Sequence, residues 1–308
     1  IYHKRPELDS NREIVSDELF SKSKNSLRNK ELYLSANYRD LSKFSKDNLQ
    51  HLNRVYLPIS ELDENFAKSI NRGTTEIFAT IDRILSEDEL VKIDAKLDSI
   101  SKYLDGVEVS NIAHLEIAKK YNLKIHAGAG FNIMNHLAVR QNKGFKITSM
   151  TLSPELNLKE LKNLSEYESG EYSYVVYGRL PLMIMRNCPF SVITKCKNDC
   201  KNCKYKTGHG LKDRKEKIFP ILKDAENNSV LYNSQKILLT DHLNLIKNCG
   251  LSEIRLEFVD ESAMEIEETI NYYIDYLEKG KKAKRPKYID ELVKQQRHTK
   301  GHMQRGVE

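Results

Sequence analysis

Short apolar runs rich in β-branched and aromatic residues alternate with amphipathic segments along most of this chain, and this rhythm limits the fold more than any other feature. Within Glu87–Leu104, apolar residues recur at spacings of three and four, as the buried stripe of a helix requires. Strands that alternate with helices form a parallel sheet, and eight of them predict a TIM-like (β/α)8 barrel. An open doubly wound sheet is the alternative, but no glycine-rich dinucleotide fingerprint follows any run. The eight runs span residues 31–36, 54–59, 76–81, 106–110, 124–129, 147–152, 172–177 and 253–259.

The rhythm breaks once, between the seventh and eighth runs, which are separated by about 75 residues. A crossover helix needs far fewer residues than that. We therefore predict a long cysteine-rich insertion over residues 178–250, on a loop that follows the seventh strand. Loops of this kind lie on the barrel face where active sites are built. The stretches "KIFPILKD" and "SVLYNSQKILL" indicate extra short strands in the insertion.

Four of the five cysteines lie within sixteen residues of this insertion, at Cys188, Cys196, Cys200 and Cys203. Four thiolates complete a tetrahedral shell for zinc, or supply one ligand to each iron of a four-iron four-sulfur cluster. The surrounding lysines favour thiolate over thiol. Both metals stay open at this point, and so do incidental disulfides or merely buried thiols. The fifth cysteine, Cys249, ends an apolar helical pattern and is expected in the core.

Composition limits the setting of the protein. The chain has 308 residues and a net charge of +6, and no apolar run reaches the ~18 residues of a membrane span. We expect no membrane partner and a cytoplasmic location, because the thiols cluster in one place and no leader is visible. The chain starts at Ile1 rather than Met, which suggests a fragment of a longer protein. We divide it into a linker, residues 1–30, and a barrel domain, residues 31–308.

Polar residues near the carboxyl ends of the predicted strands are candidates for chemistry, because these ends meet at the barrel mouth. Each has a structural alternative. His126 is equally well placed as a hydrogen-bonded core residue, and Arg179 as an ion-pair partner. In "SPEL", Ser153 as cap and Pro154 at the first helical position predict an ordinary helix start. The asparagines suit helix caps. The candidates are His126, Glu155 and Arg179 for catalysis and Asn111, Asn132, Asn135 and Ser153 for substrate binding.

The basic stretch Glu278–Lys287 is either a solvated connection or a patch that contacts phosphate. A peptidase needs an activated nucleophile or a metal-bound water. Neither HExxH nor GxSxG occurs in the sequence.

Several stretches occur together with the cysteine cluster in a specific order. They are "IHAGAGFNIMNHLA", "MTLSPEL", "VVYGRLPLMIMRNCP", "LKDRKEKIFPI", "LYNSQKILL", "EIRLEF" and "TKGHMQRGVE". In this order they resemble the collagenase-like peptidase family U32, and specifically the C-terminal barrel of its long members.

The resemblance implies a TIM-like fold and a preceding N-terminal barrel in the same polypeptide. It also implies one of two activities. Many members carry a peptidase label, whereas other relatives hydroxylate RNA bases or a quinone precursor and hold an iron–sulfur cluster through four cysteines. We therefore expect RNA-base hydroxylation, with RNA or protein as the substrate partner. The alternatives are a true protease and a non-catalytic binding module with a structural zinc.

Overall fold

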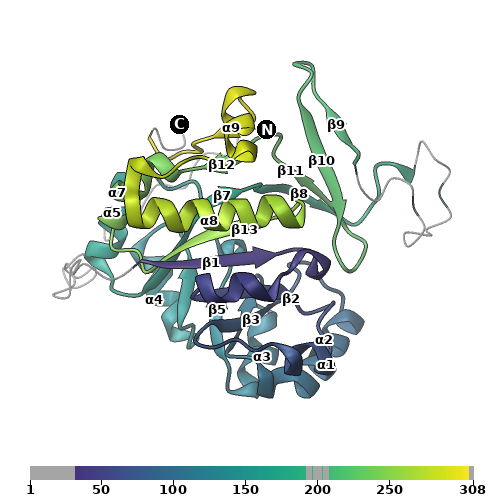
Figure 1. The fold of residues 1–308 in the computed structure, drawn as a ribbon. Helices are drawn as coiled ribbons and strands as arrows, with labels where there is room; N and C mark the ends of the chain where they lie inside the picture. The colour runs from purple at the N-terminus through teal and green to yellow at the C-terminus, as the bar shows by residue number, and fades with distance from the viewer. Residues whose placement is uncertain (1–31, 192–195, 197–202, 204–207, 305–308) are drawn as a thin grey trace, which may run out of the picture.

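The computed structural model describes residues 32–191, 196, 203 and 208–304, so the expected linker over residues 1–30 lies outside the described residues. Eight parallel strands close into a barrel, because the last strand, β13, pairs with both β1 and β7 (Figure 1). The predicted (β/α)8 barrel is confirmed. Its strands are β1 (Tyr33–Tyr38), β2 (Arg54–Pro58), β3 (Glu76–Thr80), β4 (Gly106–Val109), β5 (Lys124–Ala127), β6 (Ser149–Thr151), β7 (Glu171–Gly178) and β13 (Glu253–Phe258).

Helices on the outside connect the strands. The helix predicted over residues 87–104 is observed as α2 (Glu87–Ile100), and it buries Ile93, Leu97 and Ile100 as its spacing requires. After β1 the chain forms only 3-10 turns, η2 (Leu41–Lys43) and η3 (Lys46–His51). The other helices are α1 (Glu64–Ser69), α3 (His114–Ala118), α4 (His136–Gly144), α5 (Leu158–Tyr167), α7 (Leu243–Lys247), α8 (Ala263–Lys279) and α9 (Lys287–Lys294).

The predicted helix start after the sixth strand is wrong. Ser153 and Leu156 close a turn through a 3.1 Å backbone hydrogen bond, and helix α5 begins only at Leu158. The reason is a stronger cap further along the chain. Asn157 accepts from the amide of Glu160, whose carboxylate accepts from the amide of Asn157, and this reciprocal capping box satisfies two free amides at once.

The insertion after β7 forms its own antiparallel sheet in the order β8-β11-β10-β9, so the extra strands expected there are observed. A last strand, β12, returns antiparallel to β7 and also pairs with β14. In Figure 1 the arrowhead of β1 points toward the four-stranded sheet, which therefore stands at the carboxyl ends of the barrel strands. The ranges are β8 (Pro181–Met185), β9 (Gly210–Lys212), β10 (Ile218–Lys223), β11 (Ser229–Tyr232), β12 (Lys236–Leu238) and β14 (His298–Thr299).

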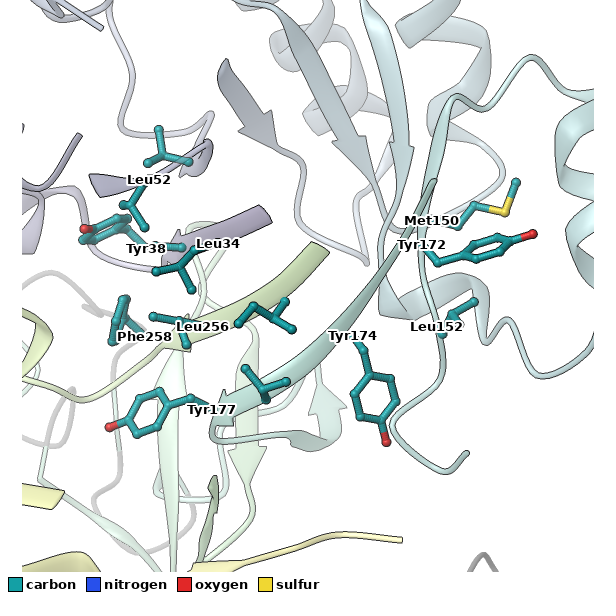
Figure 2. Close-up of a cluster of buried hydrophobic side chains, with 14 of the residues drawn as sticks. Leu34, Tyr38, Leu52, Met150, Leu152, Tyr172, Tyr174, Tyr177, Leu256 and Phe258 are labelled. Carbon is teal, nitrogen blue, oxygen red and sulfur yellow. The ribbon is translucent and has the colours of Figure 1, made fainter. Parts of the chain in front are cut away.

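The hydrophobic core lies between the outer surface of the barrel and the helices. Side chains such as Leu34, Leu256 and Phe258 point outward from neighbouring strands and pack together there (Figure 2). Each fully buried side chain of this size contributes roughly 1.5–3 kcal/mol relative to an exposed one. Cys249 is 4% exposed and belongs to this core, as expected. Because strand side chains alternate, the other half of the strand residues must face the barrel interior.

Candidate functional site

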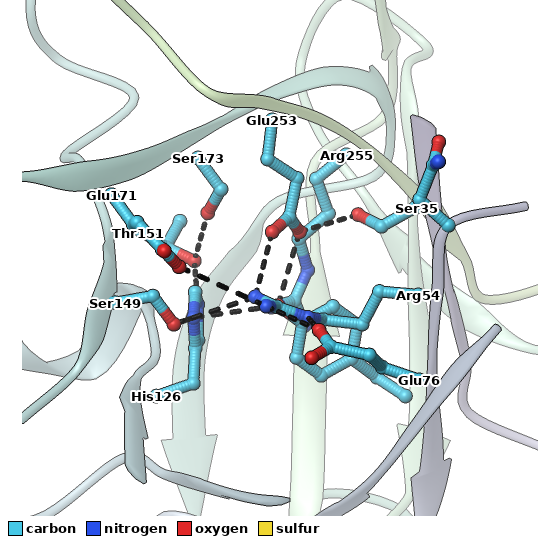
Figure 3. Close-up of polar contacts among 12 residues, drawn as sticks. Ser35, Arg54, Glu76, His126, Ser149, Thr151, Glu171, Ser173, Glu253 and Arg255 are labelled. Carbon is cyan, nitrogen blue, oxygen red and sulfur yellow. Dashed lines mark hydrogen bonds and ion pairs between the residues drawn. The ribbon is translucent and has the colours of Figure 1, made fainter. Parts of the chain in front are cut away.

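The barrel interior is built largely from charged and hydroxyl side chains rather than from branched apolar ones. At the amino end of the strands, Arg54 donates to Glu76 at 2.9 Å and to Glu253 at 2.9 Å (Figure 3). Its guanidinium also lies 4.3 Å from the centre of the Phe78 ring. Gly106 leaves the space for that ring, because a Cβ there would lie 2.2 Å from it. Burial alone would raise the pKa of Glu76, but Lys124 and Arg54 hold it below its usual range.

His126 lies in the middle of the barrel, fully buried. Its Nδ1 is 2.7 Å from the Ser149 hydroxyl and its Nε2 is 2.7 Å from the Thr151 hydroxyl, so both ring nitrogens are satisfied (Figure 3). Burial, together with the charges of Arg255 and Arg54, places its pKa well below the usual range. The ring is therefore neutral at physiological pH. His126 faces the interior, but it is not among the residues that line the cavity at the mouth.

The next layer toward the carboxyl ends is organised by Arg255, which is 2% exposed. Its guanidinium stacks 3.9 Å from the centre of the Tyr56 ring and forms ion pairs with Glu108 and Glu257. Asn37 donates to Glu257 at 2.6 Å. Burial raises the pKa of Glu108 even though Arg255 opposes the shift. Two carboxyl groups are thus fixed at the floor of the barrel mouth.

Above this layer lies a cavity of about 380 Å³, which we call the mouth cavity. One wall is polar and comes from the carboxyl ends of the barrel strands. The opposite wall is apolar and comes from the insertion, where Leu182 and Met183 on β8 are 52% and 53% exposed and Tyr232 on β11 lies alongside. The residues that line the mouth cavity include Arg39, Asp82, Glu108, Arg179, Leu182, Met183, Tyr232, Arg255 and Glu257.

Asp82 is the ionisable group of the mouth cavity best suited to proton transfer. It lies two residues after the end of β3, and its carboxylate accepts from the amide of Ala225 at 3.3 Å, in the turn between β10 and β11. Burial and the neighbouring carboxylate of Asp224 raise its pKa to about 6, against the opposing effect of Arg39. A carboxyl group with this pKa exchanges a proton readily near neutral pH.

Asp82 was not among the candidates expected from the sequence. The usable signal was its position immediately after a predicted strand, which it shares with the candidates that were chosen. Its raised pKa depends on burial and then on Asp224, which the fold brings close from a distant part of the chain.

A larger groove of about 810 Å³ adjoins the mouth cavity. The two share Arg39, Arg179 and Val259. The groove runs between the β9–β10 hairpin and the start of α8, where Ser262 and Glu265 lie. It therefore extends the mouth cavity along the surface of the insertion.

Arg179 lies where the groove meets the mouth cavity, and its guanidinium already has partners. It donates to Asp260 at 2.8 Å and to the carbonyls of Asn233 and Ser234 at 2.9 and 2.8 Å. With a side chain that is 4% exposed, it fastens the insertion to the barrel. The ion pair considered from sequence is present.

The other candidates do not gather at the mouth cavity. Asn135 caps α4, accepting from the amide of Ala138 at 2.9 Å, and Asn132 ends a 3-10 turn with a left-handed φ of 48°. Asn111 accepts from the amide of Ala113 at 3.1 Å and lines an adjoining depression of about 380 Å³, which shares Arg83, Ser110 and Gly130 with the mouth cavity.

Ser153 is buried, and its hydroxyl accepts from the amide of Glu155 at 3.4 Å. Glu155 itself is exposed in the turn before α5. Of the seven catalytic and binding candidates, only Arg179 lines the mouth cavity.

Of the clustered thiols, Cys188, Cys196 and Cys203 are half-buried and form no disulfide, whereas Cys200 lies outside the described residues. Within the part of the chain that is described, no three histidine, cysteine or acidic side chains are arranged to hold a metal. The donor chemistry nevertheless suits a soft metal. Burial would raise the pKa of Cys188, but the amides of Phe190 and Ser191 and the Lys223 ammonium lower it overall.

Cys249 behaves differently from the clustered thiols. Burial raises its pKa to about 11, so it stays a thiol. It is therefore unsuited to ligation and provides a control for experiments on the cluster.

Comparisons with known proteins agree with the geometry at the level of the family. The sequence model of peptidase family U32 matches residues 51–306. The structure titled "The Structure of the U32 Peptidase Mk0906" is similar with a TM-score of 0.44 and 14% identity, covering 76% of this chain and 95% of that one. An oxaloacetate acetylhydrolase structure gives a TM-score of 0.40 and 9% identity, covering 86% and 88%. None of the curated proteins matches the chain.

The helices were also compared with the requirements of a membrane span. In the part of the chain that the structure describes, none combines the length and the apolarity needed to cross a bilayer.

Proposed function

The chain belongs to peptidase family U32, and from this premise we propose that it is an enzyme that hydroxylates a base of RNA, with the base held in the mouth cavity. The observation that carries the proposal is the combination of shape and chemistry there. The volume of about 380 Å³ suits one heterocycle with its sugar better than an extended peptide. The groove of about 810 Å³ beside it provides room for the strand that carries the base.

The walls of the mouth cavity suit a flat ring. The exposed side chains of Leu182 and Met183, with Tyr232 beside them, offer an apolar surface against which a base can pack. Across from them, carboxyl and guanidinium groups can bond to the ring edge. A site that combines one apolar face with a few fixed polar groups is typical of small planar ligands.

Asp82 is the proton-transfer group of the proposal. With a pKa of about 6 it is mostly ionised at pH 7 and accepts a proton from the base or from a bound water. Glu108 and Glu257, held by Arg255, fix the orientation of the ring by accepting from its N–H groups. Replacing a ring C–H by C–OH removes two electrons from the base. An oxygen donor from solution must take up those electrons.

We infer that Cys188, Cys196, Cys200 and Cys203 hold a four-iron four-sulfur cluster. Four cysteines in sixteen residues and the lowered pKa of the Cys188 thiol support the inference. Such a cluster supplies one-electron transfer when it is bound. A structural zinc on the same four thiols is the alternative.

Metal analysis after anaerobic purification distinguishes the iron–sulfur cluster from the structural zinc. We expect iron and sulfide in the protein, loss of both in Cys196→Ser, and retention of both in the control Cys249→Ala. Stoichiometric zinc without sulfide would replace the iron–sulfur assignment with a structural site.

Peptide hydrolysis, the activity in the family name, is the second candidate. The neighbouring carboxyls of Asp82 and Asp224 favour it, because a carboxyl of raised pKa beside a second carboxylate can activate water. Among the described residues that line the mouth cavity there is no histidine or cysteine, so no nucleophile paired with a histidine is present there. Hydrolysis would therefore rest on water and the two carboxyls.

The decisive experiment measures RNA nucleosides in cells, where the oxygen donor is present. Cells lacking the full protein should lack one nucleoside that carries an extra oxygen, and the wild-type protein should restore it. Asp82→Asn should restore it about 100-fold less efficiently, the loss expected for a general base. The exposed Asp88→Asn is the matched control and should behave as wild type.

An identical nucleoside profile with and without the protein would overturn the proposal. If peptide release by the purified protein were then abolished by Asp82→Asn but not by Asp88→Asn, hydrolysis would take its place.

A further inference from the structure

A basic surface lies at the end of α8 that is remote from the mouth cavity. Five of the seven residues from Lys281 to Lys287 are lysine or arginine and none is acidic. Lys281, Lys282, Lys284 and Lys287 are exposed. We call residues 281–287 the basic connection, because they link α8 to α9. The mechanism proposed above makes no use of them.

The basic connection is concave. It borders a depression of about 670 Å³ and a second of about 530 Å³, which share Lys284, Arg285 and Asp290. The larger depression also includes Tyr272 and Tyr276, from the last turns of α8. Lysines and Arg285 thus line a hollow of a size that accepts one or two phosphate groups, and Asp241, Asp290 and Glu291 also line it.

Little of this positive charge is neutralised within the protein. Arg285 lies 3.4 Å from Asp241 and Lys287 lies 3.9 Å from Glu291, both long and exposed contacts. Lys281, Lys282 and Lys284 form no ion pair with any described residue. Exposed cations that are not paired internally remain available to an anion.

A second observation points to a ligand at the same place. Tyr276 lines the larger depression and is 4% exposed, and its hydroxyl has no hydrogen-bond partner among the described residues. A buried hydroxyl without a partner is unfavourable, and native structures rarely leave one unexplained. A phosphate oxygen held by the neighbouring lysines could accept from it after a small local adjustment.

We propose that the basic connection binds the phosphate backbone of the substrate RNA at a second site, away from the base in the mouth cavity. This rests on the proposed function. Helix α8 has 17 residues, and at 1.5 Å per residue it spans about 25 Å. It begins beside the groove, where Ser262 lies, and ends at the basic connection. An RNA that reaches both sites must therefore be long or folded, and the second site selects such RNA over short oligonucleotides.

The test compares two RNA probes, a hairpin of about 30 nucleotides and a single-stranded tetranucleotide, with the full protein. The variant Lys281→Gln/Lys282→Gln/Lys284→Gln should bind the hairpin at least tenfold more weakly. For this variant, the slope of log K against log salt concentration should be about one to three units shallower. Each lost phosphate contact lowers the slope by about 0.9. Binding of the tetranucleotide should stay unchanged. Lys68→Gln/Lys159→Gln/Lys162→Gln changes the net charge equally at exposed positions and should leave hairpin binding unchanged.

Tyr276→Phe separates ligand binding from folding. If the hydroxyl serves a phosphate, the variant binds the hairpin about threefold more weakly, and without RNA it unfolds at a urea concentration equal to or higher than that of wild type. Equal hairpin affinity in the basic-connection variant and the lysine control would overturn the second site alone. If the basic-connection variant loses binding to phosphatidylserine vesicles but keeps its affinity for the hairpin, the second site is also overturned alone. Failure of wild type to bind either RNA would overturn the proposed function as well.

Discussion

The two ends of the barrel interior are built from the same kinds of side chain but differ in how their charges are used. At the amino end, Arg54 joins Glu76 and Glu253, and the pKa of Glu76 is lowered. At the carboxyl end, the pKa values of Glu108 and Asp82 are raised, by burial above all. Glu76 at the amino end is therefore held in the charged form, whereas Asp82 at the mouth exchanges a proton near pH 6.

This difference follows from the number of cations available to each carboxylate. Glu76 contacts both Arg54 and Lys124. Asp82 is buried beside a second carboxylate, that of Asp224, and the Ala225 amide and the charge of Arg39 only partly oppose the rise in its pKa. The same barrel thus contains a structural end and a reactive end, and the predictions below test that division.

Removing the charge at the structural end should have the largest effect. Arg54→Met leaves Glu253 buried without its cation, which destabilises a protein by about 3–5 kcal/mol. Urea unfolding measures this loss. Lys102→Met removes an exposed, solvent-screened partner of Glu64 and should change stability far less. Equal losses in the two variants would contradict the structural role of the amino end.

The two ends should respond to pH with opposite sign. The folded pKa of Asp82, about 6, lies above its unfolded value, so the folded state binds the proton more tightly and stability falls as pH rises. Through this group, wild type should lose on the order of 2 kcal/mol of unfolding free energy between pH 4.5 and pH 7.5. Asp82→Asn should not show this loss.

Glu76 has a lowered folded pKa, so its stabilisation is present above its unfolded pKa and lost as pH falls through the folded value. Glu76→Gln should therefore be less stable than wild type at pH 7.5, with a deficit that shrinks in acid. Urea midpoints at several pH values show how the stability difference between each variant and wild type changes with pH. A change in the same direction for both variants would contradict the division into a structural and a reactive end.

The reactive end should also show in the pH dependence of activity. Because Asp82 acts as a base when it is ionised, kcat/KM should fall about fivefold from pH 6 to pH 5. Asp82→Asn should retain a low rate that no longer changes over this range. A wild-type profile without an inflection near pH 6 would assign the proton transfer to another group.

The smallest effect concerns a residue expected from sequence at the site but observed in a helix cap. Asn135→Ala should destabilise the protein by about 1 kcal/mol, because the amide of Ala138 loses its acceptor. Activity measured well below the unfolding temperature should not change. A tenfold loss of activity at unchanged stability would return Asn135 to substrate binding.

The fold was predictable because its signal is local. Each strand carries its own β-branched run, and the alternation of strands and helices limits the topology to a few choices. The start of α5 was missed because Pro154 offered a plausible first helical residue, and the reciprocal cap four residues later prevailed.

The candidate site was less predictable because its chemistry is not local. Arg54, Glu108 and Arg255 alternate with apolar residues in their strands, a pattern that also suits strands with one solvated face. The raised pKa of Asp82 depends on Asp224 from the insertion, and no feature near Asp82 in the sequence announces that neighbour. His126 was a candidate both for catalysis at the mouth and for a hydrogen-bonded core position, and its depth in the barrel decides between the two.

The two ends of the insertion meet, and this has a consequence for how the family can change. Leu180 accepts from the amide of Asn233 at 3.0 Å, and Pro181 pairs with Tyr232, so residues 181–232 leave and rejoin the barrel at a single point. Such a segment is an exchangeable cassette. Evolution or an engineer can replace it, thiols included, with a tight turn or a different module, while the cylinder beneath keeps its connectivity and its strand register.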